Sequence, residues 1–171
     1  KNYLAQADES ASVGFGGGLR TMALDTIGVP AAEAPVALES SGAAEPTRVE
    51  SAHDVATTVD RLAAAVEAAG AKVFARIDHA EGAASVDLEL APATLLIFGN
   101  PKLGTPAMQA APTMGLDLPL RVLAYQDGDT VWLAYHAPAE VAAQHRLPAN
   151  HPAILKMTGA LAKLTAEAAA Q

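Results

Sequence analysis

Asp78 and His79 are adjacent at the end of a predicted strand, and they are the first pair of side chains that could perform acid–base chemistry. A carboxylate beside an imidazole can orient the ring so that it acts as a general base. Neighbouring residues of a strand point to opposite faces, so the two side chains can meet only if the strand ends there. The alternative is that Asp78 caps the following turn and His79 makes a local hydrogen bond. The catalytic residues stay unknown, with these two as candidates.

A second group of polar residues follows the apolar run of residues 95–98. The amide of Asn100 and the ammonium of Lys102 could together hold a carboxylate, a phosphate or a similar anion. Gly99 would allow a ligand to approach the backbone closely. The alternative is that Asn100 and Pro101 begin a turn while Lys102 stays in solvent.

Asp117 is an acid in apolar surroundings, between Leu116 and Leu118. A carboxylate buried there needs a hydrogen-bond donor, and the candidates are Arg121, Lys102 and the backbone amides. The default interpretation of Asp117 is therefore structural. The identity of its partner is the question that the structure has to answer.

Histidine and methionine side chains are potential metal or haem ligands. None of them has the spacing of a ligand motif, because His145 and His151 flank a short turn and do not share a helix face. The sequence also lacks the Gly-x-Ser-x-Gly pattern of serine hydrolases. We predict no dedicated metal site, keep haem or metal binding as an alternative, and leave the cofactor unknown. The potential ligands are His53, His79, His136, His145, His151, Met108 and Met114.

The composition excludes several classes of partner. The chain has 171 residues, a formal net charge of −8 and no cysteine. Nucleic-acid binding needs clustered Lys and Arg, so we predict no nucleic-acid partner. Disulfides, thiolate metal sites and cysteine nucleophiles are excluded together. No apolar run approaches the roughly 18 residues that span a bilayer, so we predict no membrane span.

The first 46 residues differ from the rest because glycine and proline interrupt every periodic pattern there. We predict an N-terminal extension over residues 1–46 and one domain over residues 47–171. The glycine cluster at 14–18 is interpreted as a linker, since no Lys-Ser/Thr follows it as in a phosphate-binding loop. The chain begins with Lys1, which leaves open that a leader has been removed, and the compartment stays unknown, cytoplasmic or exported.

From residue 47 the pattern alternates between strands and helices. Strands are predicted over 47–50, 72–79, 94–98, 120–126 and 130–136. Helices are predicted over the segments 51–70, 105–111, 138–147 and from 150 onward, with 80–90 ambiguous. The order favours an α+β fold in which helices cover one side of an antiparallel or mixed sheet.

Several local signals set the expected ends of these elements. Ser51 is the predicted N-cap of the first helix and Gly70 its C-terminal stop, while Asn150 is the predicted cap of the last helix. In the strand 72–79, Val73, Ala75 and Ile77 are expected on one face and Phe74, Arg76 and Asp78 on the other. The connection 127–129, with glycine in its middle, predicts a hairpin.

Five separated motifs occur in order along the chain: Asp78-His79-Ala80, Phe98-Gly99-Asn100-Pro101-Lys102, Met108-Gln109-Ala110-Ala111-Pro112, Leu116-Asp117-Leu118-Pro119-Leu120 and Trp132-Leu133-Ala134-Tyr135. Together they resemble the family designated domain of unknown function 302. The resemblance runs from about residue 47 to the last helix, and it implies a β-α-β(4)-α domain with a mostly antiparallel sheet and helices on one face, similar to the TATA-binding-protein-like fold. It also implies a homodimer, and it implies no activity. One position departs from the family pattern, since His136 stands where asparagine usually follows the tyrosine.

These observations lead to one principal hypothesis and two alternatives. We expect a small homodimeric domain that binds a small, partly apolar and partly anionic ligand where the strands end. One alternative is an enzyme that uses His79 as acid or base, or a haem- or metal-binding protein. The other is that the motifs only build the fold and the dimer interface. The residues expected at the ligand are Asn100, Lys102, Met108, Asp117 and Tyr135.

Overall fold

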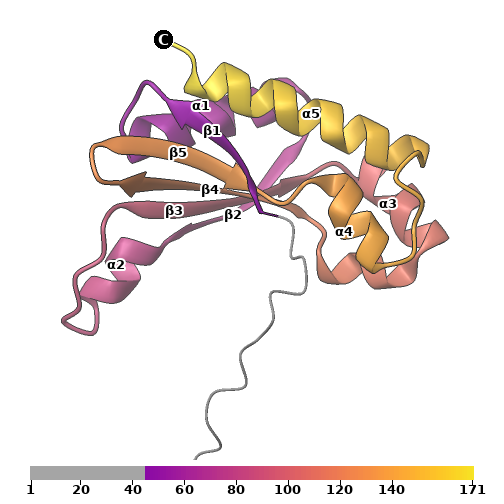
Figure 1. The fold of residues 1–171 in the computed structure, drawn as a ribbon, viewed down its shortest axis with the longest axis horizontal. Coiled ribbons are helices and arrows are strands. Elements are labelled where there is room, and N and C mark those ends of the chain that lie inside the picture. The colour runs from indigo at the N-terminus through magenta and orange to yellow at the C-terminus, as the bar shows by residue number, and fades with distance from the viewer. Residues whose placement is uncertain (1–44) are drawn as a thin grey trace, which may run out of the picture. The chain divides into compact units, whose positions relative to one another are not determined.

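The computed structural model describes residues 45–171, which build a five-stranded antiparallel sheet in the order β1-β5-β4-β3-β2 (Figure 1). Apart from its last two residues, the predicted extension, with its glycine cluster, lies outside the described residues. The strands are β1 (Thr47–Ser51), β2 (Lys72–Asp78), β3 (Ala93–Gly99), β4 (Leu120–Asp127) and β5 (Thr130–Tyr135). The helices are α1 (Val55–Ala68), α2 (His79–Ala84), α3 (Pro101–Ala110), the 3-10 helix η1 (Pro112–Leu116), α4 (Pro138–Gln144) and α5 (Pro152–Ala169).

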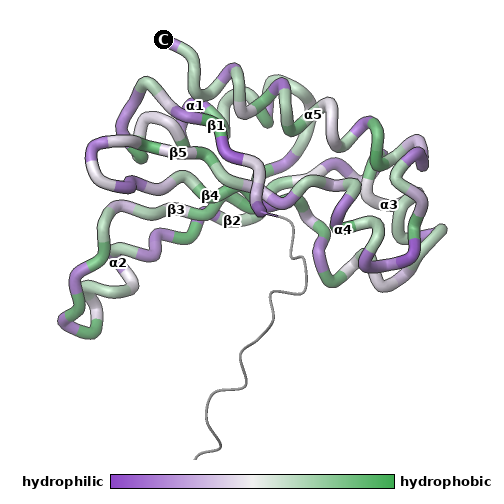
Figure 2. Tube along the Cα trace, in the orientation of Figure 1, coloured by the Kyte–Doolittle hydropathy of each residue, from purple (hydrophilic) through white to green (hydrophobic). Residues whose placement is uncertain are grey.

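The two long helices α1 and α5 lie side by side on one face of the sheet, which we call the inner face (Figure 1). With only these helices counted, the order of elements is β-α-β(4)-α, as the sequence predicted. Burial alternates strictly along β3, where Thr94, Leu96 and Phe98 are buried and their neighbours are not. Figure 2 colours most of β3 on the hydrophobic side of the scale. The strand is therefore apolar on both faces, although only one face carries helices.

Two groups of buried side chains form the core. The main core lies between the sheet and the helices α1 and α5, and the second core joins α3, η1 and α4 to the first half of α5. Leu62 and Leu133 are fully buried in the main core, and Ile154 is fully buried in the second. Because α5 contributes to both groups, it holds the α3 end of the domain against the sheet.

The N-cap of α1 is Asp54 and not Ser51, so that prediction is wrong. The chain needs residues 52–54 to turn from the edge strand β1 onto the inner face. The carboxylate of Asp54 accepts a hydrogen bond from the backbone N–H of Thr57 at 2.7 Å, and this bond lowers the pKa of Asp54. The Ser51 hydroxyl instead lies 2.7 Å from that of Thr58 inside the core. Gly70 follows the helix with a φ of +73°, as a C-terminal stop requires.

The N-cap of α5 is His151 and not Asn150, which corrects the prediction by one residue. The Nδ1 atom of His151 accepts from the N–H of Ala153 at 3.3 Å, and Pro152 occupies the first turn as expected. At the other end of α5, the guanidinium of Arg61 donates to the carbonyls of Glu167, Ala168 and Ala170. This side chain ties the last turn of α5 to α1.

A β-bulge in β2 overturns the predicted alternation of its side chains. The pairing with β3 shifts between Val73 and Ala75, so that Ala75 pairs with Ile97. Val73 consequently packs against the main core, whereas Ala75 and Ile77 belong to the opposite, outer face. Arg76 turns toward α1 and forms an ion pair with Asp60.

Helix α3 begins at Pro101, four residues earlier than predicted, because Asn100 caps it and proline is well suited to the first helical position. Pro106 therefore lies inside the helix and not in its first turn. The ambiguous segment 80–90 forms the short helix α2 and a turn. The β4–β5 hairpin is confirmed, and α4 ends at Gln144, three residues before its predicted end.

We predict that Leu62→Ala lowers the free energy of unfolding by about 2–5 kcal/mol, because the side chain is fully buried in the main core and its removal leaves a cavity. Urea unfolding followed by circular dichroism measures this. The control is Leu155→Ala on α5, whose side chain is 59% exposed, and which should change stability by less than about 0.5 kcal/mol. Equal effects of the two substitutions would contradict the assignment of the core.

Candidate functional site

An apolar cavity of about 200 Å³ lies at the end of the sheet where β3 passes into α3. We call it the α3 cavity. Almost all of its surface is hydrocarbon, and its walls come from β2, β3, α3, the segment before β4, and α5. The lining residues are Phe74, Gly99, Asn100, Pro101, Leu103, Gly104, Thr105, Met108, Leu118, Pro119, Leu120 and Met157.

Two glycines keep this space open. A Cβ atom on Gly99 would lie 3.3 Å from the Cβ of Pro119, which is tighter than most real Cβ contacts, and at an ordinary 3.6 Å from the ring of Phe74. A Cβ on Gly104 would meet Leu118 and Met108 at ordinary distances of 3.8 and 3.9 Å. The motif around Gly99 thus allows the strand, the following helix and residues 118–119 to approach each other closely.

Two of the predicted ligand residues, Asn100 and Met108, line the α3 cavity. The side-chain oxygen of Asn100 accepts from the N–H of Lys102 at 2.9 Å, and its amide nitrogen donates to the carbonyl of Gly70 at 3.3 Å. Both ends of the amide thus have partners within the protein. Lys102 is exposed and does not line the cavity. The alternative interpretation expected Asn100 and Pro101 to begin a turn and Lys102 to stay in solvent; Asn100 and Pro101 instead begin the helix α3, and Lys102 is exposed.

Asp117 lies outside the α3 cavity and is held by two bases. Its Oδ1 atom accepts from Arg121 at 2.9 Å, and its Oδ2 lies 2.7 Å from Nε2 of His145. The other ring nitrogen of His145 lies 2.9 Å from the hydroxyl of Thr113. Arg121 was among the predicted partners. His145, named above only as a potential metal ligand, was not predicted as a partner of Asp117, and it lies 28 residues away beyond the β4–β5 hairpin.

The His145 side chain is only 9% exposed, and both of its nitrogens have a partner. The order hydroxyl, imidazole, carboxylate is the order of a proton relay. The hydrogen-bonded group of these three side chains also joins two elements. Thr113 belongs to η1, and His145 is the C-cap of α4. We interpret the group as a clamp that fixes the segment in front of β4 and thereby the Leu118–Pro119 wall of the α3 cavity.

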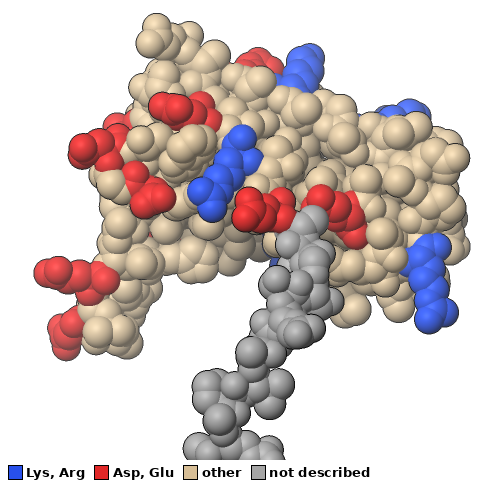
Figure 3. Space-filling view, in the orientation of Figure 1, with Lys and Arg blue, Asp and Glu red and all other residues tan. Residues whose placement is uncertain are grey.

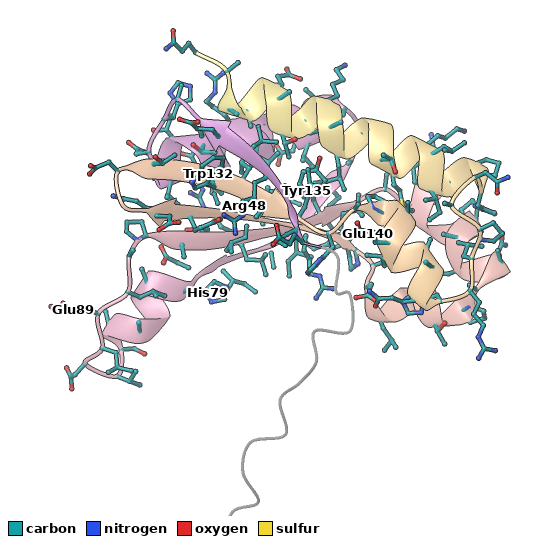
Figure 4. The ribbon with its side chains drawn as sticks, viewed as in Figure 1. Arg48, His79, Glu89, Trp132, Tyr135 and Glu140 are labelled. Atoms are coloured by element: carbon teal, nitrogen blue, oxygen red, sulfur yellow. The ribbon has the colours of Figure 1, made fainter. Side chains whose placement is uncertain are left out.

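Asp78 and His79 are not brought to the cavity. The carboxylate of Asp78 caps α2 by accepting from the N–H of Glu81 at 3.0 Å, which matches the alternative interpretation of this residue. His79 is exposed on the first turn of α2, and Figure 4 places it at the end of the sheet opposite α3. Within the described range, no hydrogen bond joins His79 to Asp78, Asp117 or Tyr135, which the enzyme hypothesis required.

Tyr135 ends β5 and packs, partly buried, against the main core, so it lines neither the α3 cavity nor the smaller cavity beside Asp117. That smaller cavity measures about 40 Å³, and His136 contributes to its lining. Among residues 45–171, no group of three or more His, Cys, Asp or Glu side chains is arranged to hold a metal ion. None of the helices in the described part of the chain is long and apolar enough to cross a membrane.

The fold and the cavity define an α+β domain with a helix-backed antiparallel sheet and an apolar site at one end of it. Residues 47–164 match the family described as "Domain of unknown function DUF302", and the chain belongs to this family. A crystal structure of an uncharacterised conserved DUF302 protein from Bacillus stearothermophilus has the same fold. The TM-score is 0.60 at 20% sequence identity, and the match covers 74% of this chain and 97% of that one.

Curated relatives come from Brucella. The "Fluoride-specific ion channel FluC 1" of Brucella suis is 45% identical over 123 residues, which are 69% of this chain and 48% of that protein. The "Fluoride-specific ion channel FluC 2" of Brucella melitensis is also 45% identical over 123 residues, 46% of its length. The chain therefore spans about half the length of the curated relatives that it matches.

We predict that Asp117→Ala lowers the free energy of unfolding by about 1–3 kcal/mol, since it leaves the nearly buried His145 ring without its carboxylate. Asp60→Ala is the matched control, because Asp60 also pairs with an arginine but is 68% exposed, and we expect a loss of at most about 1 kcal/mol. Chemical denaturation of both variants gives the comparison. If Asp117→Ala loses no more free energy of unfolding than Asp60→Ala, the interpretation of this group as a clamp is wrong.

Proposed function

We propose that this domain binds a small, largely apolar molecule in the α3 cavity. The observation that carries the proposal is the combination of a volume of about 200 Å³ with an almost wholly hydrocarbon lining. For comparison, an enclosed cavity of about 150 Å³ lined by Leu, Ile and Phe binds benzene. The volume therefore suits one aromatic ring or short branched chain with a few further atoms.

The size and lining of the α3 cavity restrict the range of ligands that the sequence suggested. The lining contains Asn100 and Thr105 as its polar side chains, and the amide of Asn100 is already engaged in capping α3. Binding would therefore come mainly from burial of apolar surface, at about 25 cal/mol per Å² removed from water.

We predict that Gly104→Leu abolishes binding of toluene, a probe of the size of the cavity, because the new side chain occupies the cavity. The helix α3 should tolerate leucine at position 104, since a Cβ there makes only ordinary contacts. Gly159→Leu is the matched control, as it lies on α5 with no atom within 4 Å of its Cβ position. Toluene should raise the melting temperature of the wild type and of the control, but not that of Gly104→Leu. Equal responses of both variants would place the binding elsewhere.

We also propose that the domain is a homodimer that associates through the outer face of the sheet. Helix α2 and the following turn project on this side, away from α1 and α5 (Figure 1). We call residues 79–92 the α2 arm. Its side chains Val86, Leu88 and Leu90 are more than half exposed, and Ile77 beside it is 42% exposed. An exposed apolar surface of this kind is typical of a protein–protein interface.

Charge complementarity favours a second copy of the chain as the occupant of this face. The arm carries exposed acids, including Glu81, Asp87 and Glu89 (Figure 3). Arg48 lies on the outer face of β1, at the opposite edge of the sheet, in the same row of paired residues as Ile77. A twofold axis in the plane of the interface can thus place the arm of each protomer against Arg48 of its partner.

We predict that Leu88→Asp converts the dimer to a monomer, because it buries a charge in the proposed interface. Leu155→Asp is the matched control, since Leu155 is equally exposed, at 59% against 65%, but lies on α5. Light scattering coupled to size-exclusion chromatography gives the mass of each. A monomeric wild type, or a Leu88→Asp variant that stays dimeric, would refute this interface.

A further inference from the structure

A lysine that the sequence did not single out, Lys72, lies beside a wall residue of the α3 cavity, although it is not itself part of the lining. The ammonium of Lys72 is 5.5 Å from the centre of the Phe74 ring, and Phe74 is a wall of the cavity. The backbone of Lys72 pairs with Gly99, which also lines the cavity. Both the main chain and the charged end of Lys72 therefore lie against residues of the site.

The β-bulge accounts for this position. In a regular ladder, Phe74 would have a single partner on β3, but here Val73 pairs with Phe98 and Ala75 with Ile97, which leaves Phe74 outside the pairing. The Phe74 ring is free to lean toward Gly99, where its edge would lie 3.6 Å from a Cβ. The ammonium of Lys72 lies over the Phe74 ring, 5.5 Å from its centre.

The charge of Lys72 is available for a ligand. Within residues 45–171, Lys72 belongs to none of the ion pairs, which use Arg76, Arg121 and His145. None of the residues that line the cavity is an acid, so a bound anion meets no negative side chain there. The Asn100 amide, which the sequence offered as a ligand group, uses its oxygen on the N–H of Lys102 and one of its two N–H groups on the carbonyl of Gly70.

We propose that Lys72 is the head-group residue of this site, and that the natural ligand is a small monocarboxylate whose apolar part fills the α3 cavity. This inference rests on the proposed function and adds the ligand class to it. The carboxylate would lie at the Phe74 rim, where it accepts hydrogen bonds from the Lys72 ammonium while staying hydrated. The ring or chain would extend between Gly104, Met108 and Met157.

The test compares a carboxylate with a neutral probe of similar size, phenylacetate with toluene, by ligand-observed NMR on the full chain. We expect the wild type to bind phenylacetate about threefold or more tighter than toluene, the gain that a solvent-exposed ion pair supports. Lys72→Gln should remove this preference and leave toluene binding unchanged. Both lysines are exposed and neither belongs to the lining. Lys102→Gln is the matched control and should keep the preference, because among residues 45–171 the ammonium that lies over the ring of a wall residue is that of Lys72. Added salt should weaken phenylacetate binding alone.

The outcomes separate the two proposals. If neither probe binds the wild type, the proposed function fails and this inference fails with it. If toluene binds but phenylacetate binds no better, or if Lys72→Gln lowers both affinities equally, the cavity stands and Lys72 has no head-group role. A preference that is lost in Lys102→Gln would move the head group to α3 and also overturn the inference.

Discussion

The packing of α1 and α5 on the inner face of the sheet is the interaction on which the rest of the domain depends. Helix α5 has 18 residues, about 27 Å of helix, and its buried side chains belong in succession to the second core and to the main core. Met157 packs near α3 and lines the cavity, whereas Leu161 and Leu164 pack on the sheet. The cavity therefore lies at the junction of two cores that share one rigid helix.

The sequence predicted the architecture well because its main elements carry strong periodic signals. The apolar face of α1, the buried strand β3 and the glycine-centred hairpin are local patterns, and each was found where it was expected. The errors concern the ends of elements and, in β2, the alternation of side chains. Ser51 and Asn150 are good capping residues, but the path of the chain between elements decides which residue caps, and that path is a tertiary property.

The candidate site was predictable only in part, for related reasons. The motif around Gly99 and Asn100 lies at the end of the sheet that carries the α3 cavity. Asp78 and His79 were candidates for acid–base catalysis because they are adjacent. A carboxylate at the end of a strand can equally cap the next helix, as Asp78 does. The pairing of Asp117 with His145 joins residues from η1 and α4, and no local pattern reports such a contact. Lys72 gains its position from a bulge, which the alternation of apolar residues in β2 does not reveal.

Because of the bulge, the residues of β2 that pair with β3 are different from the residue of β2 that lines the α3 cavity. On its two sides, Val73 pairs with Phe98 and Ala75 with Ile97, so the ladder with β3 would be regular if residue 74 were absent. The residue that lines the cavity is thus an insertion into an otherwise complete strand. Relatives that lack this one residue could keep the whole sheet and still lose a wall of the site. The length of the β2 segment is therefore a simple sequence marker that would divide the family into members with and without this cavity.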